Sequence, residues 1–214
     1  MKFIIMCGGP TLHESTPRPL REVNGEILVA RTIRLLRYHD IMDIAISSTD
    51  ARFEQFGVTV LAHDNKVEGA DCHWLQCFYP TDEPVCYLMG DVYYSDRAIS
   101  TIINTRTNDI EFFASAPPFS PYYIKRFGEP FAFKVQNQKH FRECVEETLR
   151  YEAEGKFHRE AIAWELWQVI KGTELNLVQT NYIVINDYTV DVDSDRQAKL
   201  LEERLKMKFV GVKY

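Results

Sequence analysis

The sequence has no long apolar run and no excess of basic charge, and these two absences exclude several functions. Its first apolar stretch, residues 3–7, is too short for a signal sequence, and no later run approaches the roughly 18 residues that a membrane-spanning helix needs. The formal net charge of −6 at pH 7 argues against broad binding to nucleic acid or to anionic membranes. We therefore expect a cytoplasmic protein that has neither nucleic acid nor a membrane as a partner.

The sequence also lacks paired cysteines. Its five cysteines are an odd number, and none of them belongs to a Cys-x-x-Cys motif, so neither a disulfide framework nor a zinc site is favoured. Cys7 and Cys86 lie inside apolar runs and are best explained as buried thiols. A reducing compartment follows, in agreement with a cytoplasmic location.

The pattern of apolar residues indicates a single α/β domain. The length of 214 residues, with 45% hydrophobic and 26% charged residues, suits one domain with a full core. In residues 1–109, short apolar runs that are typical of buried strands alternate with helical periods. The expected strands cover residues 3–7, 41–47, 58–62 and 84–89, and the expected helices cover 26–37, 71–79 and 95–103. Such alternation predicts a Rossmann-like domain with a mostly parallel central sheet and helices on both faces.

Residues 110–188 follow a different pattern. Two expected strands, 110–114 and 131–135, enclose a segment rich in Pro, Tyr and Phe without clear periodicity, and loops of this kind commonly build a substrate pocket. Helices are expected at 137–154 and 158–171, and two short strands at 175–178 and 182–185. Ser194 and Gln197 form a capping-box pattern that predicts the start of a last helix.

The first strand is followed by residues suited to binding phosphate. Gly8 and Gly9 end the apolar run, and because glycine has no Cβ, their backbone N–H groups can approach an anion closely. Arg18 stands between Pro17 and Pro19, which restrict the backbone around it and so offer a fixed cation near the glycines. These features predict a cradle for a triphosphate.

Two acidic segments are candidates for metal binding. Asp91 directly follows an expected buried strand, and in an open parallel sheet ligands bind outside the carboxyl ends of the strands. Its use there would be to bind Mg²⁺, although a turn or a helix cap would also explain an Asp at this place. Asp191 and Asp193 alternate with valines, so on an extended segment both point the same way and need a cation or an Arg between them. The alternative for this pair is a solvated strand edge, with Asp193 supporting the start of the following helix.

Four segments, taken in their order along the chain, resemble the nucleotidyltransferase superfamily of the GT-A type, which includes the sugar-phosphate nucleotidylyltransferases. They are Cys7-Gly8-Gly9, Thr16-Pro17-Arg18-Pro19-Leu20 with Val23-Asn24-Gly25, Leu88-Met89-Gly90-Asp91-Val92-Tyr93, and Asp191-Val192-Asp193-Ser194. The resemblance spans nearly the whole chain. It implies a Mg²⁺-dependent reaction in which a phosphorylated acceptor, such as a sugar phosphate, attacks the α-phosphorus of a nucleoside triphosphate and expels pyrophosphate.

The resemblance also implies roles for individual residues. Arg18 and Asp91 would be catalytic, and Asp91, Asp191 and Asp193 would be the metal ligands. The residues implied in nucleotide binding are Cys7, Gly8, Gly9, Pro10, Thr11, Arg18, Gly69 and Ala70, and those implied in acceptor binding are Tyr123, Lys125, Glu129 and Lys134. Residues 1–214 would form one nucleotidyltransferase domain, with a nucleotide-binding half (1–109), an acceptor-binding subregion (110–188) and a metal-ligand segment with the C-terminal helix (189–214). A homodimer is a possible assembly.

The sequence departs from the family pattern in its glycine loop. The loop is shorter than usual, it lacks the Arg that grips the β- and γ-phosphates, and Arg18 replaces the usual Lys. Arg keeps the charge and gains bidentate phosphate geometry, and Arg21 is a candidate for the missing contact. Within the fold, the alternative is a GT-A glycosyltransferase, although the segment after Gly90 lacks the second aspartate usual in those enzymes. The alternative from another class is a nucleotide-sensing protein without turnover.

Overall fold

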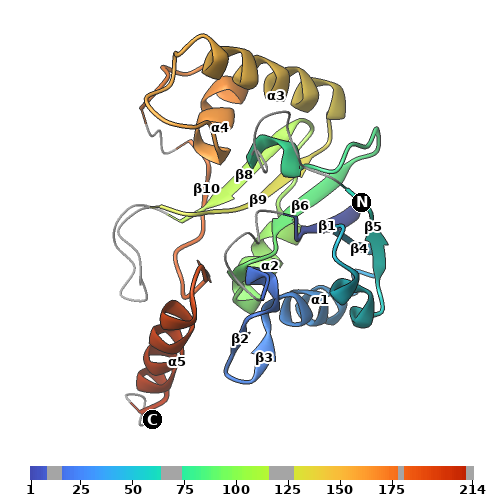
Figure 1. The fold of residues 1–214 in the computed structure, drawn as a ribbon, viewed down its shortest axis with the longest axis vertical. Coiled ribbons are helices and arrows are strands. Elements are labelled where there is room, and N and C mark those ends of the chain that lie inside the picture. The colour runs from blue at the N-terminus through green and yellow to red at the C-terminus, as the bar shows by residue number, and fades with distance from the viewer. Residues whose placement is uncertain (9–15, 64–73, 116–127, 178–180, 211–214) are drawn as a thin grey trace.

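A seven-stranded mixed sheet forms the centre of the molecule (Figure 1). The computed structural model describes residues 1–8, 16–63, 74–115, 128–177 and 181–210. In spatial order the strands are β10 (Ile183–Val184), β8 (Ile110–Ala114), β9 (Pro130–Val135), β6 (Val85–Met89), β1 (Lys2–Met6), β4 (Ile44–Ser47) and β5 (Thr59–Leu61). Only β9 runs antiparallel to its neighbours, and the other pairings within this sheet are parallel. The prediction of a mostly parallel sheet is confirmed.

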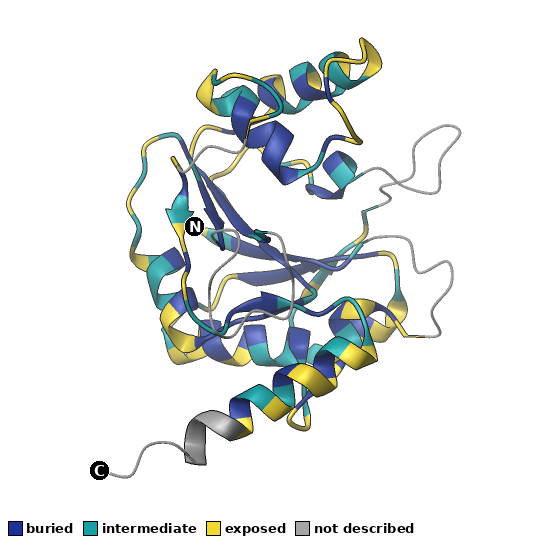
Figure 2. Cartoon of the chain, turned by 90° about the vertical axis from the view of Figure 1, so that its left-hand side faces the viewer, coloured by how far each residue is buried: buried dark blue, intermediate teal, exposed yellow. Residues whose placement is uncertain are grey.

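Helices cover both faces of this sheet, as predicted. Figure 2 shows α3 (Gln138–Ala153) and α4 (Ala163–Lys171) on one side, and α1 (Leu28–Tyr38) and α2 (Asp96–Asn104) on the other. Two of these helices begin at side-chain caps: Ser95 Oγ accepts a hydrogen bond from the backbone N–H of Ala98, and Asn137 Oδ1 accepts one from His140. No helix within the described ranges is long and apolar enough to cross a membrane.

Two small antiparallel pairings lie beside the main sheet. The first is a hairpin of β2 (Glu22–Val23) and β3 (Glu26–Ile27), whose turn residues Asn24 and Gly25 have φ values of 54° and 75°. Positive φ at both positions is what a tight type I′ turn requires, and an Asn-Gly pair supplies it at low cost. The second joins β7 (Val92–Tyr93) to β11 (Val190–Asp191), just before α5 (Asp195–Val210).

The C-terminal helix packs through a second hydrophobic cluster. Leu201 and Leu205 of α5 are buried in a cluster with Val23 of the hairpin, Leu28 of α1 and Tyr93 of β7. This cluster is separate from the main core, which fills both sides of the large sheet. It attaches the last segment of the chain to the residues that immediately follow the first loop.

Several element boundaries differ from the predictions. The helix expected at 26–37 begins two residues later because residues 26 and 27 form β3, and α4 begins at Ala163 instead of residue 158. The backbone N–H of Ile162 donates to Glu165 Oε2, which fixes that later start. Of the strand expected at 175–178, the described residues 175–177 lie in no strand, because Asn176 has a φ of 64° and sits in a turn. Of the helix expected at 71–79, the described part contains only the 3₁₀ helix η3 (Trp74–Cys77).

Candidate functional site

The predicted phosphate and metal segments begin at the same edge of the sheet. β1 and β6 are parallel neighbours with Met6 opposite Met89, so Gly8 and Asp91 follow adjacent strand ends. Gly90 makes this approach possible: its N–H donates to Met6 O at 3.0 Å, and a Cβ at this position would lie only 2.8 Å from Cys7 Sγ. A larger residue would push the end of β6 away from β1. The close packing therefore explains the glycine before Asp91.

A distant segment brings a second carboxylate to Asp91. The β7–β11 pairing is extended by a hydrogen bond of 2.9 Å from the N–H of Val192 to Asp91 O. Asp193 follows directly, and its Oδ1 lies 2.7 Å from Arg18 Nη1, while Asp91 Oδ2 lies 4.0 Å from the same nitrogen. The side chains of Arg18, Asp91 and Asp193 are 49%, 28% and 33% exposed, so this cluster is open to solvent. Three of the predicted site residues thus face one point.

The donor chemistry of this cluster fits Mg²⁺. Carboxylate oxygens are hard ligands, and Mg²⁺ is commonly held by one or two carboxylates together with substrate phosphates and water. Within the described residues, no group of three or more His, Cys, Asp or Glu side chains could hold a metal ion. Asp91 and Asp193 would therefore supply part of a coordination shell, and a phosphorylated substrate would supply the rest.

Asp191 and Glu129 have a different arrangement. The N–H of Asp191 donates to Glu129 Oε2 at 3.1 Å, and Glu129, directly before β9, is only 4% exposed. Ser115 holds Glu129 in turn, because Ser115 Oγ accepts from the N–H of Glu129 at 2.8 Å. In these contacts the Glu129 carboxylate supports the backbone of the metal-ligand segment. The sequence suggested two equivalent aspartates, but it is Asp193 that contacts Arg18.

Arg21 does not reach toward a phosphate site. Its side chain is 7% exposed, its Nε donates to Asp195 Oδ1 at 3.2 Å, and its Nη1 donates to Val192 O at 3.2 Å. The expectation that Arg21 replaces the missing arginine of the glycine loop is therefore wrong. Its guanidinium is buried at the start of α5, because it donates to two acceptors on the segment that carries Asp193.

Lys134 requires a similar correction. It is 7% exposed, and its Nζ donates to the carbonyl oxygens of Ile102, Ile103 and Thr105 at 2.7–3.0 Å. These carbonyls belong to the end of α2, where the last turn of a helix leaves acceptors without helical partners. Because β9 is antiparallel to β6, Lys134 lies beside Cys86 near the start of β6, whereas the carboxylates lie beyond its end. Its ammonium group stabilises a helix end, and we remove it from the acceptor site.

The capping pattern at Ser194 and Gln197 contributes to the site in a way that the sequence did not reveal. Ser194 Oγ accepts from the N–H of Gln197 at 3.3 Å, as the pattern predicts. The side chain of Gln197, however, accepts from the N–H of Asp193 at 2.6 Å, one residue before the expected partner. Gln197 therefore orients the backbone of the proposed metal ligand, and the capping box was the signal that could have identified it.

The remaining predicted residues divide into two groups. Cys7 is buried, and burial together with the charge of Asp91 raises the pKa of its thiol, so the side chain stays protonated at neutral pH. Cys7 and Gly8 lie at the end of β1, where nucleotide binding through their backbone stays a prediction. The following predicted residues lie outside the described ranges: Gly9, Pro10, Thr11, Gly69, Ala70, Tyr123 and Lys125. A cavity of about 270 Å³ between η3 and α3 is lined by none of the predicted site residues.

Three solved structures with a similar fold are named as CTP or cytidylyl transferases. The inositol-1-phosphate CTP transferase from T. maritima has a TM-score of 0.57 at 14% identity, with 100% of this chain and 98% of that chain covered. The CTP:phosphocholine cytidylyltransferase from Streptococcus pneumoniae has a TM-score of 0.54 at 18% identity, with 95% of this chain and 98% of that chain covered. The 2-C-methyl-D-erythritol 4-phosphate cytidylyltransferase from Thermus thermophilus has a TM-score of 0.57 at 12% identity, with 96% of this chain and 98% of that chain covered. No family model and no curated protein matches the sequence. The likeness confirms the predicted α/β fold over nearly the whole chain.

Proposed function

We propose that this protein is a Mg²⁺-dependent nucleotidyltransferase that joins the nucleoside monophosphate of a triphosphate to a small phosphorylated acceptor and releases pyrophosphate. One observation carries the proposal: Arg18, Asp91 and Asp193, from three distant parts of the chain, face a common point beyond the ends of β1 and β6. The fold supports it, because the three structures described above are named for nucleotidyl transfer, each to a phosphorylated small molecule. A sugar phosphate or a similar metabolite is the acceptor class that we propose.

The residues of the cluster would act mainly by position and charge. An oxygen of the acceptor phosphate attacks the α-phosphorus, the bond from this phosphorus to the β-bridging oxygen breaks, and pyrophosphate leaves with the electron pair. Asp91 and Asp193 would hold Mg²⁺, which supplies neutralisation of the charge at the α-phosphate when it is bound. Arg18 would bind phosphate oxygens, and the N–H of Gly8 would point to the same region from the end of β1. Little covalent work falls to the protein in such a reaction, so alignment and charge account for catalysis.

Pyrophosphate release tests this proposal directly. The purified protein is incubated with Mg²⁺, each of the four common ribonucleoside triphosphates and a panel of phosphorylated acceptors, and the joined product is identified by mass spectrometry. We expect release with at least one pair, dependent on both substrates. Transfer of a sugar from a nucleotide sugar, without pyrophosphate release, would instead identify a glycosyltransferase.

A nucleotide-sensing protein is the second candidate. The observation that favours it is the burial of Arg21, because this leaves the short glycine loop without the replacement arginine that the sequence suggested. Tight triphosphate binding without turnover for any acceptor would support the sensor and reject the enzyme. Cytoplasmic location and a homodimer stay predictions from the sequence.

A further inference from the structure

We infer that Arg21 is a positioning residue that holds Asp193 in place for metal binding. The inference rests on the proposed function, since that function gives Asp193 its role as a metal ligand. Arg21 has no place in the family resemblance, and its position three residues after Arg18 suggested a different use. In the structure it contacts the segment that carries Asp193.

Two acceptors of Arg21 lie on either side of Asp193. Nη1 donates to the carbonyl of Val192, one residue before Asp193, and Nε donates to the carboxylate of Asp195, two residues after it. The guanidinium therefore spans the turn between β11 and α5. A planar group with donors in fixed directions suits two acceptors of this kind, whereas the ammonium of a Lys is a point charge on a flexible stem.

The same turn is held from the side of β7 and from within α5. The N–H of Val192 donates to Asp91 O, and the N–H of Asp193 donates to the side chain of Gln197. Only Arg21 among these contacts comes from the segment that follows the first loop. It therefore links the place of Asp193 to that of Arg18, which lies one 3₁₀ turn earlier, in η1 (Arg18–Leu20).

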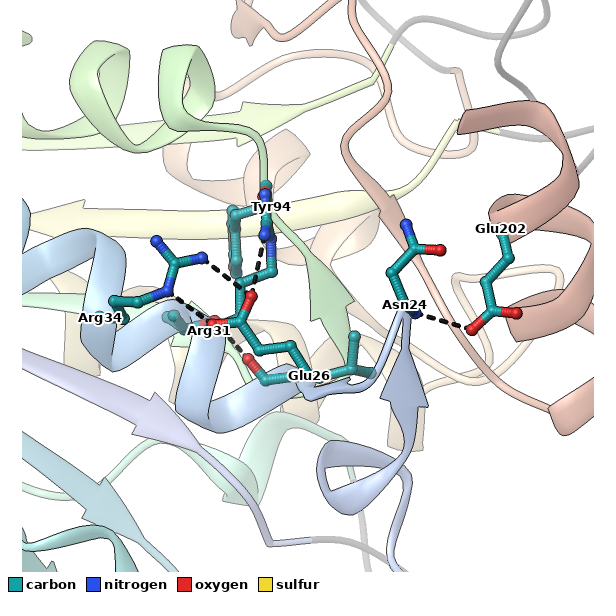
Figure 3. Close-up of polar contacts among 8 residues, drawn as sticks. Asn24, Glu26, Arg31, Arg34, Tyr94 and Glu202 are labelled. Carbon is teal, nitrogen blue, oxygen red and sulfur yellow. Dashed lines mark hydrogen bonds and ion pairs between the residues drawn. The ribbon is translucent and has the colours of Figure 1, made fainter. Parts of the chain in front are cut away.

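The hairpin extends this link along α5. Figure 3 shows Asn24 at the tip of the hairpin facing Glu202, where the N–H of Asn24 donates to Glu202 Oε1 at 2.7 Å. On its other side, Glu26 contacts Arg31 and Arg34 of α1 at 2.6–3.0 Å. The hairpin is thus attached to both helices by contacts that do not involve Arg21. Loss of Arg21 is expected to loosen the turn at 192–195 without detaching α5.

A matched pair of variants separates positioning from general support. Arg21→Met removes the guanidinium at the turn, and Arg31→Met removes a guanidinium that is also mostly buried and also bonds to one carbonyl, Tyr94 O, and one carboxylate, Glu26. Both variants lose a hydrogen bond to a carbonyl and one to a carboxylate, and Arg31→Met also loses the stacking of the guanidinium over Tyr93, so both are expected to lower the melting temperature. Arg21→Lys keeps the charge and tests whether the planar fork is needed.

The readouts are calorimetric titration of Mn²⁺ into each protein and hydrogen exchange of the amides in residues 190–197. We expect Arg21→Met to weaken Mn²⁺ binding by about tenfold, a typical effect of removing support from a metal ligand, and to speed exchange in this segment. Arg21→Lys should recover part of the affinity, and Arg31→Met should leave both readouts at the wild-type values. In turnover assays, Arg21→Met should need a higher Mg²⁺ concentration for half-maximal rate, while its KM for the nucleotide stays the same.

Equal Mn²⁺ affinity in wild type and Arg21→Met would overturn the inference, as would an equal loss in Arg31→Met. Failure of the proposed function looks different: the wild-type protein then gives no pyrophosphate with any substrate pair, while the Mn²⁺ titrations still compare the variants. A wild-type protein that binds no Mn²⁺ would overturn the inference together with the metal assignment.

Discussion

The carboxyl edge of β1 and β6 and the part of the sheet formed by β8 and β9 use positive charge in different ways. In β8 and β9, the rings of Phe112 and Phe133 stack with their centroids 4.5 Å apart, and Lys134 of β9 is buried with three carbonyl partners at the end of α2. At the carboxyl edge, Arg18 is half exposed and pairs with carboxylates that a substrate or a metal ion can reach. The difference teaches that charge alone does not mark a binding residue. A cation that binds a substrate needs exposed partners that the substrate can replace.

The largest expected effect is the loss of activity in Asp91→Asn. This variant tests whether the exposed carboxylates at the carboxyl edge bind the metal ion. The amide keeps the shape of the side chain but loses the charge that attracts Mg²⁺. We expect a fall in kcat/KM of at least about 100-fold, or about 3 kcal/mol, with the melting temperature nearly unchanged. Initial rates over a range of Mg²⁺ concentrations measure the effect. Full activity with an unchanged Mg²⁺ requirement would remove Asp91 from the metal site.

Lys134→Met tests the other side of the comparison. The substitution leaves three carbonyls at the end of α2 without their donor, so we expect a loss of about 2 kcal/mol in unfolding free energy. Urea unfolding measures this loss, and kcat/KM is expected to match wild type where both proteins are folded. A variant with normal stability and a raised KM for the acceptor would instead restore the role that the sequence suggested for Lys134.

Arg18→Gln tests whether Arg18 and a metal ion compete for Asp193. Because Arg18 Nη1 and a metal ion would use the same oxygen of Asp193, removal of the guanidinium should strengthen Mn²⁺ binding to the nucleotide-free protein. It should also raise the KM for the triphosphate by about tenfold, or about 1.4 kcal/mol, because a charged phosphate contact is lost. Calorimetry and steady-state kinetics measure the two opposite changes. Weaker binding of both Mn²⁺ and nucleotide would show that Arg18 supports the site without competing for it.

The smallest effect is expected at the hairpin of β2 and β3, which packs against α5. Asn24 has a φ of 54°, which costs most L-residues about 1 kcal/mol, so Asn24→Ala should lower the unfolding free energy by about that amount. The contact with Glu202 uses the backbone N–H of Asn24 and is retained, so activity should stay near that of wild type. Thermal unfolding and turnover measured on the same sample check both points. A large loss of activity would show that the hairpin sets the geometry of the site.

Local sequence signals predicted most of the main elements correctly. The strand at residues 110–114 matches β8 in full, and the helix expected at 137–154 matches α3 with Asn137 as its cap. These elements depend on burial patterns and capping residues that lie within a few positions of one another. The short pairings of β2 with β3 and of β7 with β11 were missed, because two-residue strands carry too little periodicity to detect.

The sequence by itself determined the fold class, the position of Asp91 after a buried strand and the start of the last helix after Ser194, since each depends on neighbouring residues. Only the tertiary structure decided that Asp193 contacts Arg18, that Arg21 is buried against the same turn, and that Lys134 caps α2. The Arg18–Asp193 contact joins residues 175 positions apart. Contacts over such distances depend on how strands and helices pack, and residue types alone do not report that packing.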